Sequence, residues 1–283
     1  MKTIIPKKEM QGLANLYRQE GKRIAFVPTM GFLHEGHLSL IRRARKQGDI
    51  VVTSIYVNPT QFGPKEDYDV YPRDLERDRV LASDAGTDIL FVPSDQEMYE
   101  PNHQTTVRVE RLTRRLCGAS RPWHFPGVTT IVTKLFNIVK PHIAVFGQKD
   151  AQQAIVIRRM VKDLDMDIEI DVGPIVREKD GLAMSSRNKY LSPQERAEAT
   201  ILYSSLQLAK EMIEKGERDA NTIKEAMREM IDAVETSRID YIEIVDTENL
   251  EPLEKLEGDV LIAVAVFFGA TRLIDNILFK DIK

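Results

Sequence analysis

Short apolar runs alternate with amphipathic segments along about the first 175 residues of the chain. The runs are rich in Val and Ile, and they lie at residues 23–28, 49–58, 88–94, 142–148 and 168–174. Runs that are nearly continuous in apolar character are typical of strands buried on both faces of a parallel sheet. We therefore predict five parallel strands in this part of the chain.

Helical periodicity fills the intervals between these runs. The predicted helices cover about residues 5–20, 37–47, 72–86, 126–140 and 150–164. In the fourth of them, apolar residues at spacings of three and four form one stripe, made of Val128, Ile131, Leu135 and Ile138. Strands that alternate with helices in this way predict a doubly wound α/β domain with right-handed crossovers.

The pattern changes after about residue 175. A polar stretch, REKDGLAMSSRNKYLS, leads to SPQE at 192–195, which predicts a helix start with Ser192 as N-cap and Glu195 as its partner. Helical patterns continue to about 235, and strand-like runs follow at 239–246 and 260–268. We therefore expect two domains, a doubly wound domain at 1–175 and a smaller C-terminal α+β domain at 176–283.

The composition fits a globular enzyme and limits the classes of partner that the protein could bind. The 283 residues are 42% apolar and 30% charged, with a net charge of -4. This charge gives no sign of a nucleic-acid binder. The longest apolar run, at 260–270, is too short to span a bilayer, and the first ten residues resemble no signal peptide. We expect a cytoplasmic protein that binds neither nucleic acid nor membrane.

Cys117 is the single cysteine of the chain. It rules out an internal disulfide and a cysteine-rich zinc site. Its surroundings, RRLCGAS, contain no motif that activates a thiol, so a structural role is the favoured interpretation.

Polar residues follow three of the predicted strands. PTMGFLHEGH comes after the first strand, NPTQFG after the second and GQKDAQQ after the fourth. In an open parallel sheet, ligands bind in the crevice beyond the carboxyl ends of the strands. We therefore expect these three loops to converge on one site.

His34 and His37 lie three residues apart at the expected start of a helix, so both project to the same side of its first turn. This turn has unsatisfied N–H groups and attracts phosphate, and Gly36 lets a ligand approach the backbone. Zinc is disfavoured, because H-E-x-x-H needs the histidines four apart. Two solvated surface histidines remain the alternative.

The other loops offer amides, hydroxyls and cations. Lys149 suits phosphates or developing negative charge. Alternatively, Asp150 caps the following helix, with Gln153 as its partner in a capping box. Gln61 and Asn58 gain interest only from their position after a strand. MSSR, at 184–187, is either a mobile loop that closes over a triphosphate or a solvated linker.

Six of these segments together closely resemble the pantothenate synthetase (pantoate–β-alanine ligase) family. They are PTMGFLHEGHLSL, VNPTQF, YPRDLERD, SRPWHFPGVTTIVTKLFN, FGQKDAQQ and DGLAMSSRNKYLS, in order through about residues 23–191, and RLIDN at 272–276 is also similar. H-x-G-H and MSSR further resemble signatures of the wider nucleotidylyltransferase and class I aminoacyl-tRNA synthetase superfamily.

The resemblance implies an AMP-forming ligase with a Rossmann-like N-terminal domain. Pantoate would attack the α-phosphate of ATP to give pantoyl adenylate, and β-alanine would then displace AMP to give pantothenate, a precursor of coenzyme A. Mg²⁺ is expected with the ATP, and a homodimer is expected as the assembly.

The resemblance also assigns roles to residues. His37, Lys149, His34 and Arg187 would be catalytic, and Gln61, Gln153 and Asn58 would hold pantoate and β-alanine. No metal ligand is assigned. The ATP contacts would be Pro28, Thr29, Met30, Gly31, His34, Gly36, His37, Gly147, Gln148, Lys149, Asp150, Val176, Met184, Ser185, Ser186 and Arg187.

One position departs from the family, where Gly is commoner than the Trp123 of this chain. We expect this ring to affect the packing of a loop at the rim and not the chemistry. Two other functions stay open: a nucleotidylyltransferase that acts on a small phosphorylated alcohol, and a nucleotide-binding regulator without catalysis. The first is disfavoured because its chemistry does not call for the pair Gln61 and Gln153. The second is disfavoured because simple binding would not require His34, His37, Lys149 and Arg187 together.

Overall fold

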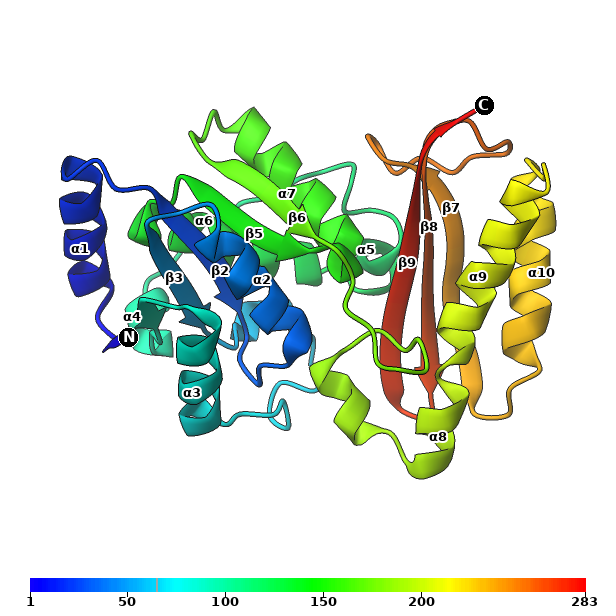
Figure 1. Ribbon diagram of the computed structural model, residues 1–283, viewed down its shortest axis with the longest axis horizontal. Helices are drawn as coiled ribbons and strands as arrows, with labels where there is room; N and C mark the ends of the chain where they lie inside the picture. The colour runs from blue at the N-terminus through cyan, green and yellow to red at the C-terminus, as the bar shows by residue number, and fades with distance from the viewer. Residues whose placement is uncertain (65) are drawn as a thin grey trace.

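Two separate sheets organise the computed structural model, which describes residues 1–64 and 66–283 (Figure 1). The larger sheet is parallel throughout and has the strand order β1-β4-β3-β2-β5-β6. Its strands are β1 (Lys2–Ile4), β2 (Ile24–Thr29), β3 (Ile50–Ile55), β4 (Ile89–Phe91), β5 (Ile143–Gly147) and β6 (Glu169–Gly173). This confirms the five predicted strands and the doubly wound α/β class, and it adds β1.

Helices cover both faces of this sheet. On one face, α1 (Lys7–Gln19), α6 (His124–Val139) and α7 (Ala151–Asp163) enclose an apolar core that includes Phe26 and Phe91. On the other face, α2 (Glu35–Arg45) and α3 (Leu75–Ala85) pack over Val27 and Val51. Short turns lie between these elements: η1 (Pro59–Gln61), α4 (Asp95–Met98), α5 (Cys117–Ser120) and η2 (Gln148–Asp150).

The strand order reverses at β2. From this strand the chain moves outward through β3 and β4, and it later returns to the other side of β2 with β5. The loops that leave β2 and β5 therefore diverge and open a crevice at the carboxyl edge of the sheet. The H-x-G-H loop follows β2 and the GQKD turn follows β5, so the topology places both at this crevice.

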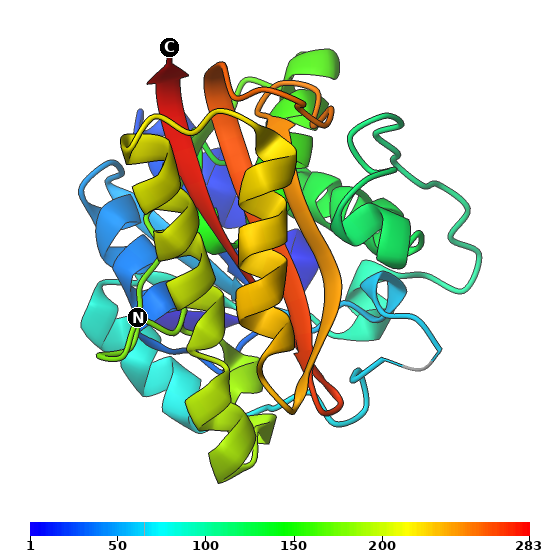
Figure 2. The same cartoon turned by 90° about the vertical axis from the view of Figure 1, so that its right-hand side faces the viewer.

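The smaller sheet is antiparallel, with the order β7-β8-β9. Its strands are β7 (Ser237–Asp246), β8 (Gly258–Phe268) and β9 (Thr271–Ile282). Figure 2 shows α9 (Ile201–Glu214) and α10 (Ala220–Asp232) side by side over these strands. The predicted α+β character of this region is confirmed, although β9 was not predicted.

The polar segment between the two sheets ends in short helices. It contains η3 (Ser186–Tyr190) and α8 (Pro193–Glu198). Ser192 and Glu195 form the predicted capping box, in which each side chain accepts from the backbone N–H of the other residue. In the part of the chain that the structure describes, no helix is long and apolar enough to cross a membrane.

Candidate active site

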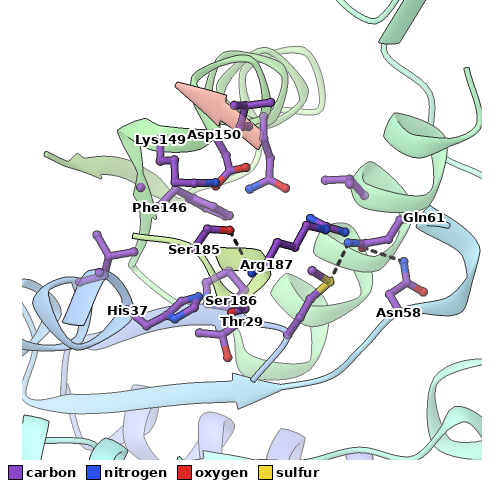
Figure 3. Close-up of a pocket in the computed structure, with 18 of the residues that line it drawn as sticks. Thr29, His37, Asn58, Gln61, Phe146, Lys149, Asp150, Ser185, Ser186 and Arg187 are labelled. Atoms are coloured by element: carbon purple, nitrogen blue, oxygen red, sulfur yellow. Dashed lines mark hydrogen bonds between the residues drawn. The ribbon is translucent and has the colours of Figure 1, made fainter. Parts of the chain in front are cut away.

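A cavity of about 250 Å³ lies at the crevice beyond β2 and β5, and residues from the β9 region also line it. Packing defects in protein interiors rarely exceed the size of a water molecule, so a space of this size indicates a binding site. Figure 3 shows His37 and Thr29 on one side of it, Lys149 and Asp150 on another, and Gln61 with Asn58 at a third. The expected convergence of three loops is confirmed.

Most residues singled out in the sequence line this cavity. They are Pro28, Thr29, Met30, His34, Gly36, His37, Asn58, Gln61, Gly147, Lys149, Asp150, Gln153, Val176, Met184, Ser185, Ser186 and Arg187. Gly31 and Gln148 do not line it.

His34 and His37 face each other at the start of α2, with ring centroids 4.1 Å apart. His34 is the N-cap by its backbone position, and its N–H donates to Nδ1 of His37 at 3.3 Å. Because this nitrogen accepts, the proton of a neutral His37 ring is on Nε2. The fold therefore leaves His37 with a directed N–H donor.

Both rings are held in the neutral form. Burial and the charge of Lys149 lower the pKa of His34 to about 4. Burial, then His34 and Lys149, lower the pKa of His37 well below its usual value of 6.5. Nδ1 of His34 is buried without a hydrogen-bond partner among the described residues. An unsatisfied buried nitrogen of this kind is suited to a ligand.

Two glycines of this loop have structural roles, one in the backbone turn and one beside the ring of His34. Gly31 has a φ of +82°, and a Cβ there would lie 2.8 Å from Ile55 Cγ2, so its conformation and its space both require glycine. This turn directs the N–H groups of Phe32 and Leu33 to the carboxylate of Asp78, each at 2.7 Å. Gly31 thus shapes the loop from outside the cavity.

Gly36 lies beneath the ring of His34. A Cβ at this position would come within 2.9 Å of the imidazole. The sequence predicted that Gly36 opens the backbone to a ligand, and the structure shows that it also makes room for His34.

The GQKD turn is hydrogen-bonded to β9 of the second sheet. Asn276 of β9 donates to the carbonyl oxygens of Gln148 and Lys149 at 2.9 and 3.0 Å, and it accepts from Gln148 Nε2 at 3.0 Å. The side chain of Gln148 is therefore engaged with Asn276 at the junction of the two sheets.

The capping box predicted for Asp150 and Gln153 is wrong. Asp150 has the N-cap position of α7, but its carboxylate accepts no capping hydrogen bond. The 3₁₀ turn η2 leads directly into the helix, and both side chains line the cavity. The adjacent Gln152 has the structural role, because its amide bonds to the backbone of Cys117, Leu112 and Arg115.

Asn58 positions Gln61. The side chain of Asn58 is almost fully buried, and its Nδ2 donates to Gln61 Oε1 and to Gly127 O, both at 3.2 Å. Its Oδ1 accepts from Thr60 and Tyr99. Gln61 Nε2 contacts Met30 Sδ at 3.0 Å, and a dashed line in Figure 3 marks the bond between Asn58 and Gln61. The Asn58 amide is thus used within the protein, and Gln61 faces the cavity.

The MSSR loop is ordered by contacts with two distant loops. Arg187 forms a bidentate ion pair with Asp67, at 2.8 and 2.9 Å, and stacks over Tyr71. Ser186 donates to the carbonyl of Phe32 at 3.2 Å, and the Ser185 hydroxyl accepts from Arg187 N–H at 3.2 Å. These bonds place the guanidinium of Arg187 at the cavity (Figure 3).

Comparison with known proteins gives a consistent result. The family model for pantoate-beta-alanine ligase matches residues 2–278. The chain belongs to the pantoate–β-alanine ligase family. The pantothenate synthetase of Caldicellulosiruptor bescii is 59% identical over 272 residues, or 96% of each chain. That of Thermotoga petrophila is 58% identical over 276 residues, 98% of this chain and 99% of the other.

Solved structures of the same family agree in fold. A pantothenate synthetase from Thermus thermophilus has a TM-score of 0.93 at 46% identity, covering 98% of this chain and 99% of its own. A pantoate-beta-alanine ligase from Francisella tularensis, complexed with beta-gamma ATP and beta-alanine, has a TM-score of 0.80 at 32% identity, covering 98% and 97%. The predicted ligase family and fold are confirmed.

Several polar residues of this ligase cavity were missed in the sequence. Arg121, His124, Tyr71 and Arg272 line it, and Asp67 orients Arg187. Burial and the charge of Arg121 lower the pKa of His124 to about 4. Its Nδ1 donates to the carbonyl of Gln61 at 3.0 Å, since the partner is an acceptor only. Tyr71, Arg121, His124 and Arg272 lie in YPRDLERD, SRPWHFPG and RLIDN, which marked the family without assigning these side chains, whereas Asp67 lies outside these motifs.

Trp123 lies outside the cavity lining, as expected. Its exposed ring packs against Gly63, where a Cβ would come within 2.4 Å of the indole, and its Nε1 donates to Glu66 at 3.3 Å. The ring therefore shapes the loop after β3. Within residues 1–64 and 66–283, no group of three or more His, Cys, Asp or Glu side chains is arranged to hold a metal ion.

Proposed function

We propose that this member of the pantoate–β-alanine ligase family activates pantoate with ATP as pantoyl adenylate and then transfers the pantoyl group to β-alanine. Products would be pantothenate, AMP and pyrophosphate. The observation that carries the proposal is that one cavity brings together a helix start suited to phosphate, the cations Lys149 and Arg187, and a pocket lined by amides and apolar side chains.

The triphosphate would bind along the H-x-G-H, GQKD and MSSR segments. The first turn of α2 offers backbone N–H groups and the positive end of a helix dipole. His37 contributes its Nε2–H, and Lys149 and Arg187 bring positive charge to the same cavity. Such donors stabilise the charge that develops on the α-phosphate and on departing pyrophosphate.

Pantoate would bind between Gln61 and Gln153. It has two hydroxyl groups for hydrogen bonds and two methyl groups that need an apolar surface. The wall of the cavity beside α6 supplies this surface, from Val128, Ile131, Val132, Leu135 and Phe146. A pocket that combines amides with a branched apolar wall suits this acid better than a phosphorylated alcohol, so we favour the ligase over the nucleotidylyltransferase alternative.

Catalysis would rest on position and charge. The pantoate carboxylate attacks the α-phosphate, and the resulting acyl phosphate gives the second step a good leaving group. No protein nucleophile is needed in this route. His37, His34, Lys149 and Arg187 act by holding the reacting groups and by stabilising the transition state.

Mg²⁺ would accompany ATP. This ion keeps several waters and is commonly bound through one or two carboxylates and the substrate phosphates. Asp150 lines the cavity and its carboxylate accepts no helix-capping bond, so its chemistry fits this role. Bound there, Mg²⁺ would neutralise phosphate charge.

We further propose that the chain divides near residue 175, with residues 1–175 binding ATP and pantoate and 176–283 covering the site. The polar segment that contains Val176 and MSSR joins the two sheets and lines the cavity. A homodimer in the cytoplasm remains our expectation for the assembly and its location.

One assay tests the proposal. With ATP, pantoate and β-alanine, AMP and pyrophosphate should form in step with pantothenate. Without β-alanine, one equivalent of pyrophosphate and an enzyme-bound adenylate should accumulate. Production of ADP and phosphate would exclude the adenylate route, and a protein that binds ATP without turnover would support the regulator.

A further inference from the structure

Two arginines from different parts of the fold converge on the sulfur of Cys117. Arg121 follows α5 and Arg272 lies on β9. Nη1 of Arg121 is 3.8 Å from Cys117 Sγ, and Nη1 of Arg272 is 4.0 Å from the same atom. All three residues line the cavity.

Each guanidinium is also held by hydrogen bonds through its Nε and Nη2 atoms. Arg121 donates through Nε to Glu66 at 2.7 Å and also through Nη2, while Arg272 donates through Nε and Nη2 to Asp240 at 2.9 and 2.7 Å. The two arginine side chains are only 14% and 16% exposed. Arg121 donates to both oxygens of Glu66, whereas Arg272 directs Nε and Nη2 to one oxygen, Oδ2, of Asp240. Two hydrogen bonds along one edge restrain the plane of each guanidinium, so the direction of each Nη1 is also restrained.

The Nη1 donors lack a strong acceptor. Among the described residues, neither donates a hydrogen bond to a carboxylate or a carbonyl oxygen, and their shared neighbour is a thiol. A thiol is a weak acceptor, whereas guanidinium groups bind carboxylates with several strong hydrogen bonds. The arrangement is therefore a prepared site for a small carboxylate.

The reaction indicates which carboxylate this is. The inference rests on the proposed function, in which the carboxylate of pantoate is consumed in the adenylate. The triphosphate is assigned to the His34, His37, Lys149 and Arg187 end of the cavity. The carboxylate of β-alanine stays ionised throughout and needs its own partner.

We propose that Arg121 and Arg272 bind the carboxylate of β-alanine above Cys117. Its amine then points back into the cavity toward the pantoyl group. The distance between the two arginines and the pantoyl group would then select amines that carry a carboxylate on a short chain. Because Arg272 belongs to the second sheet, this sheet takes part directly in choosing the amine.

Two steady-state variants test the assignment. In Arg121→Gln and in Arg272→Gln, kcat/KM for β-alanine should fall between about tenfold and a hundredfold, which corresponds to a lost charged hydrogen bond. In Arg272→Gln, pyrophosphate release in the absence of β-alanine should stay within about twofold of the wild type, which also shows that this variant folds. Arg121 additionally donates to the carbonyl of Gln61 at 3.3 Å, so in Arg121→Gln the same release is measured at saturating pantoate. Arg115→Gln is the matched control, because Arg115 pairs with Glu251 outside the cavity.

An amine series tests the assignment in the wild type and in the two arginine variants. The wild type should strongly prefer β-alanine over propylamine, and the two arginine variants should lose most of this preference. Cys117→Asp places a carboxylate between the two Nη1 groups and should depress the use of β-alanine while adenylation continues.

Two results would overturn the assignment: kcat/KM for β-alanine within about threefold of the wild type in both arginine variants, or equal use of the two amines by the wild type. Absence of pyrophosphate release from the wild type would instead reject the proposed function.

Discussion

Arg187 and Asp67 form a bidentate ion pair although they are 120 residues apart in the chain. Burial raises the pKa of Asp67, but the hydrogen bonds and charge of Arg187 hold it below the usual value. The pair occupies the Nε and Nη2 donors of Arg187 and leaves Nη1 for a ligand. Asp67 is therefore a positioning residue for the MSSR loop.

Replacement of Asp67 tests this relationship. In Asp67→Asn the guanidinium keeps its charge and loses its fixed direction, so the rate of adenylate formation should fall about tenfold. kcat/KM for β-alanine at saturating ATP and pantoate should change less. Rapid-quench measurement of pyrophosphate checks the first point. A rate that rises would show instead that Asp67 withholds Arg187 from ATP.

Lys149 is expected to matter most for the first step. Its side chain lies at the cavity, and no salt bridge involves it within residues 1–64 and 66–283. Lys149→Ala should lower the rate of adenylate formation by about 10²–10³, as for the loss of a donor that stabilises transition-state charge. Single-turnover adenylation at a near-normal rate would remove Lys149 from this role. Lys189→Ala is a suitable control, because it removes an exposed cation that lies over Phe32 and does not line the cavity.

The neighbours Gln152 and Gln153 offer a paired comparison. Gln153→Ala should raise the KM for pantoate more than the KM for ATP, because its amide faces the cavity. Gln152→Ala removes three hydrogen bonds to buried backbone and should lower the free energy of unfolding by about 1–3 kcal/mol. The KM for pantoate should change less in Gln152→Ala than in Gln153→Ala. Equal effects of Gln153→Ala on both substrates would argue against a pantoate contact.

The strands and the site loops could be predicted because their signals are local. A run such as 142–148 indicates a buried strand without knowledge of the fold, and the polar residues behind it then fall at the sheet edge. His34, Lys149 and Gln61 were found in this way. β9 was missed because Arg272, Asp275 and Asn276 interrupt its apolar pattern.

The supporting residues could not be predicted because their partners are far away in sequence. Asn58 looked like a substrate ligand, and its partners Gly127 and Tyr99 became visible only in the fold. Asp78 supports the H-x-G-H loop from a helix 45 residues away. The same holds for Arg121 and Arg272, whose meeting at Cys117 joins the two sheets. Spacing within one segment carries no information about such contacts.

His124 links stability to pH. Its pKa is about 4 in the folded chain and near 6.5 when unfolded, so between these values the unfolded state binds more protons. The free energy of unfolding must therefore decrease as pH falls through this window, and it is restored above the unfolded pKa. His34 and His37 contribute with the same sign, because their pKa values are also lowered.

Urea unfolding at about pH 7.5 and about pH 5 measures this effect. In His124→Gln the drop in unfolding free energy between the two conditions should be smaller than in the wild type, by about 1–2 kcal/mol. Glutamine can still donate to the carbonyl of Gln61, so stability at the higher pH should change less. His103→Gln is the control, because this residue is exposed and does not line the cavity. An equal drop in the wild type and His124→Gln would mean that His124 is protonated in the folded protein near its ordinary pKa.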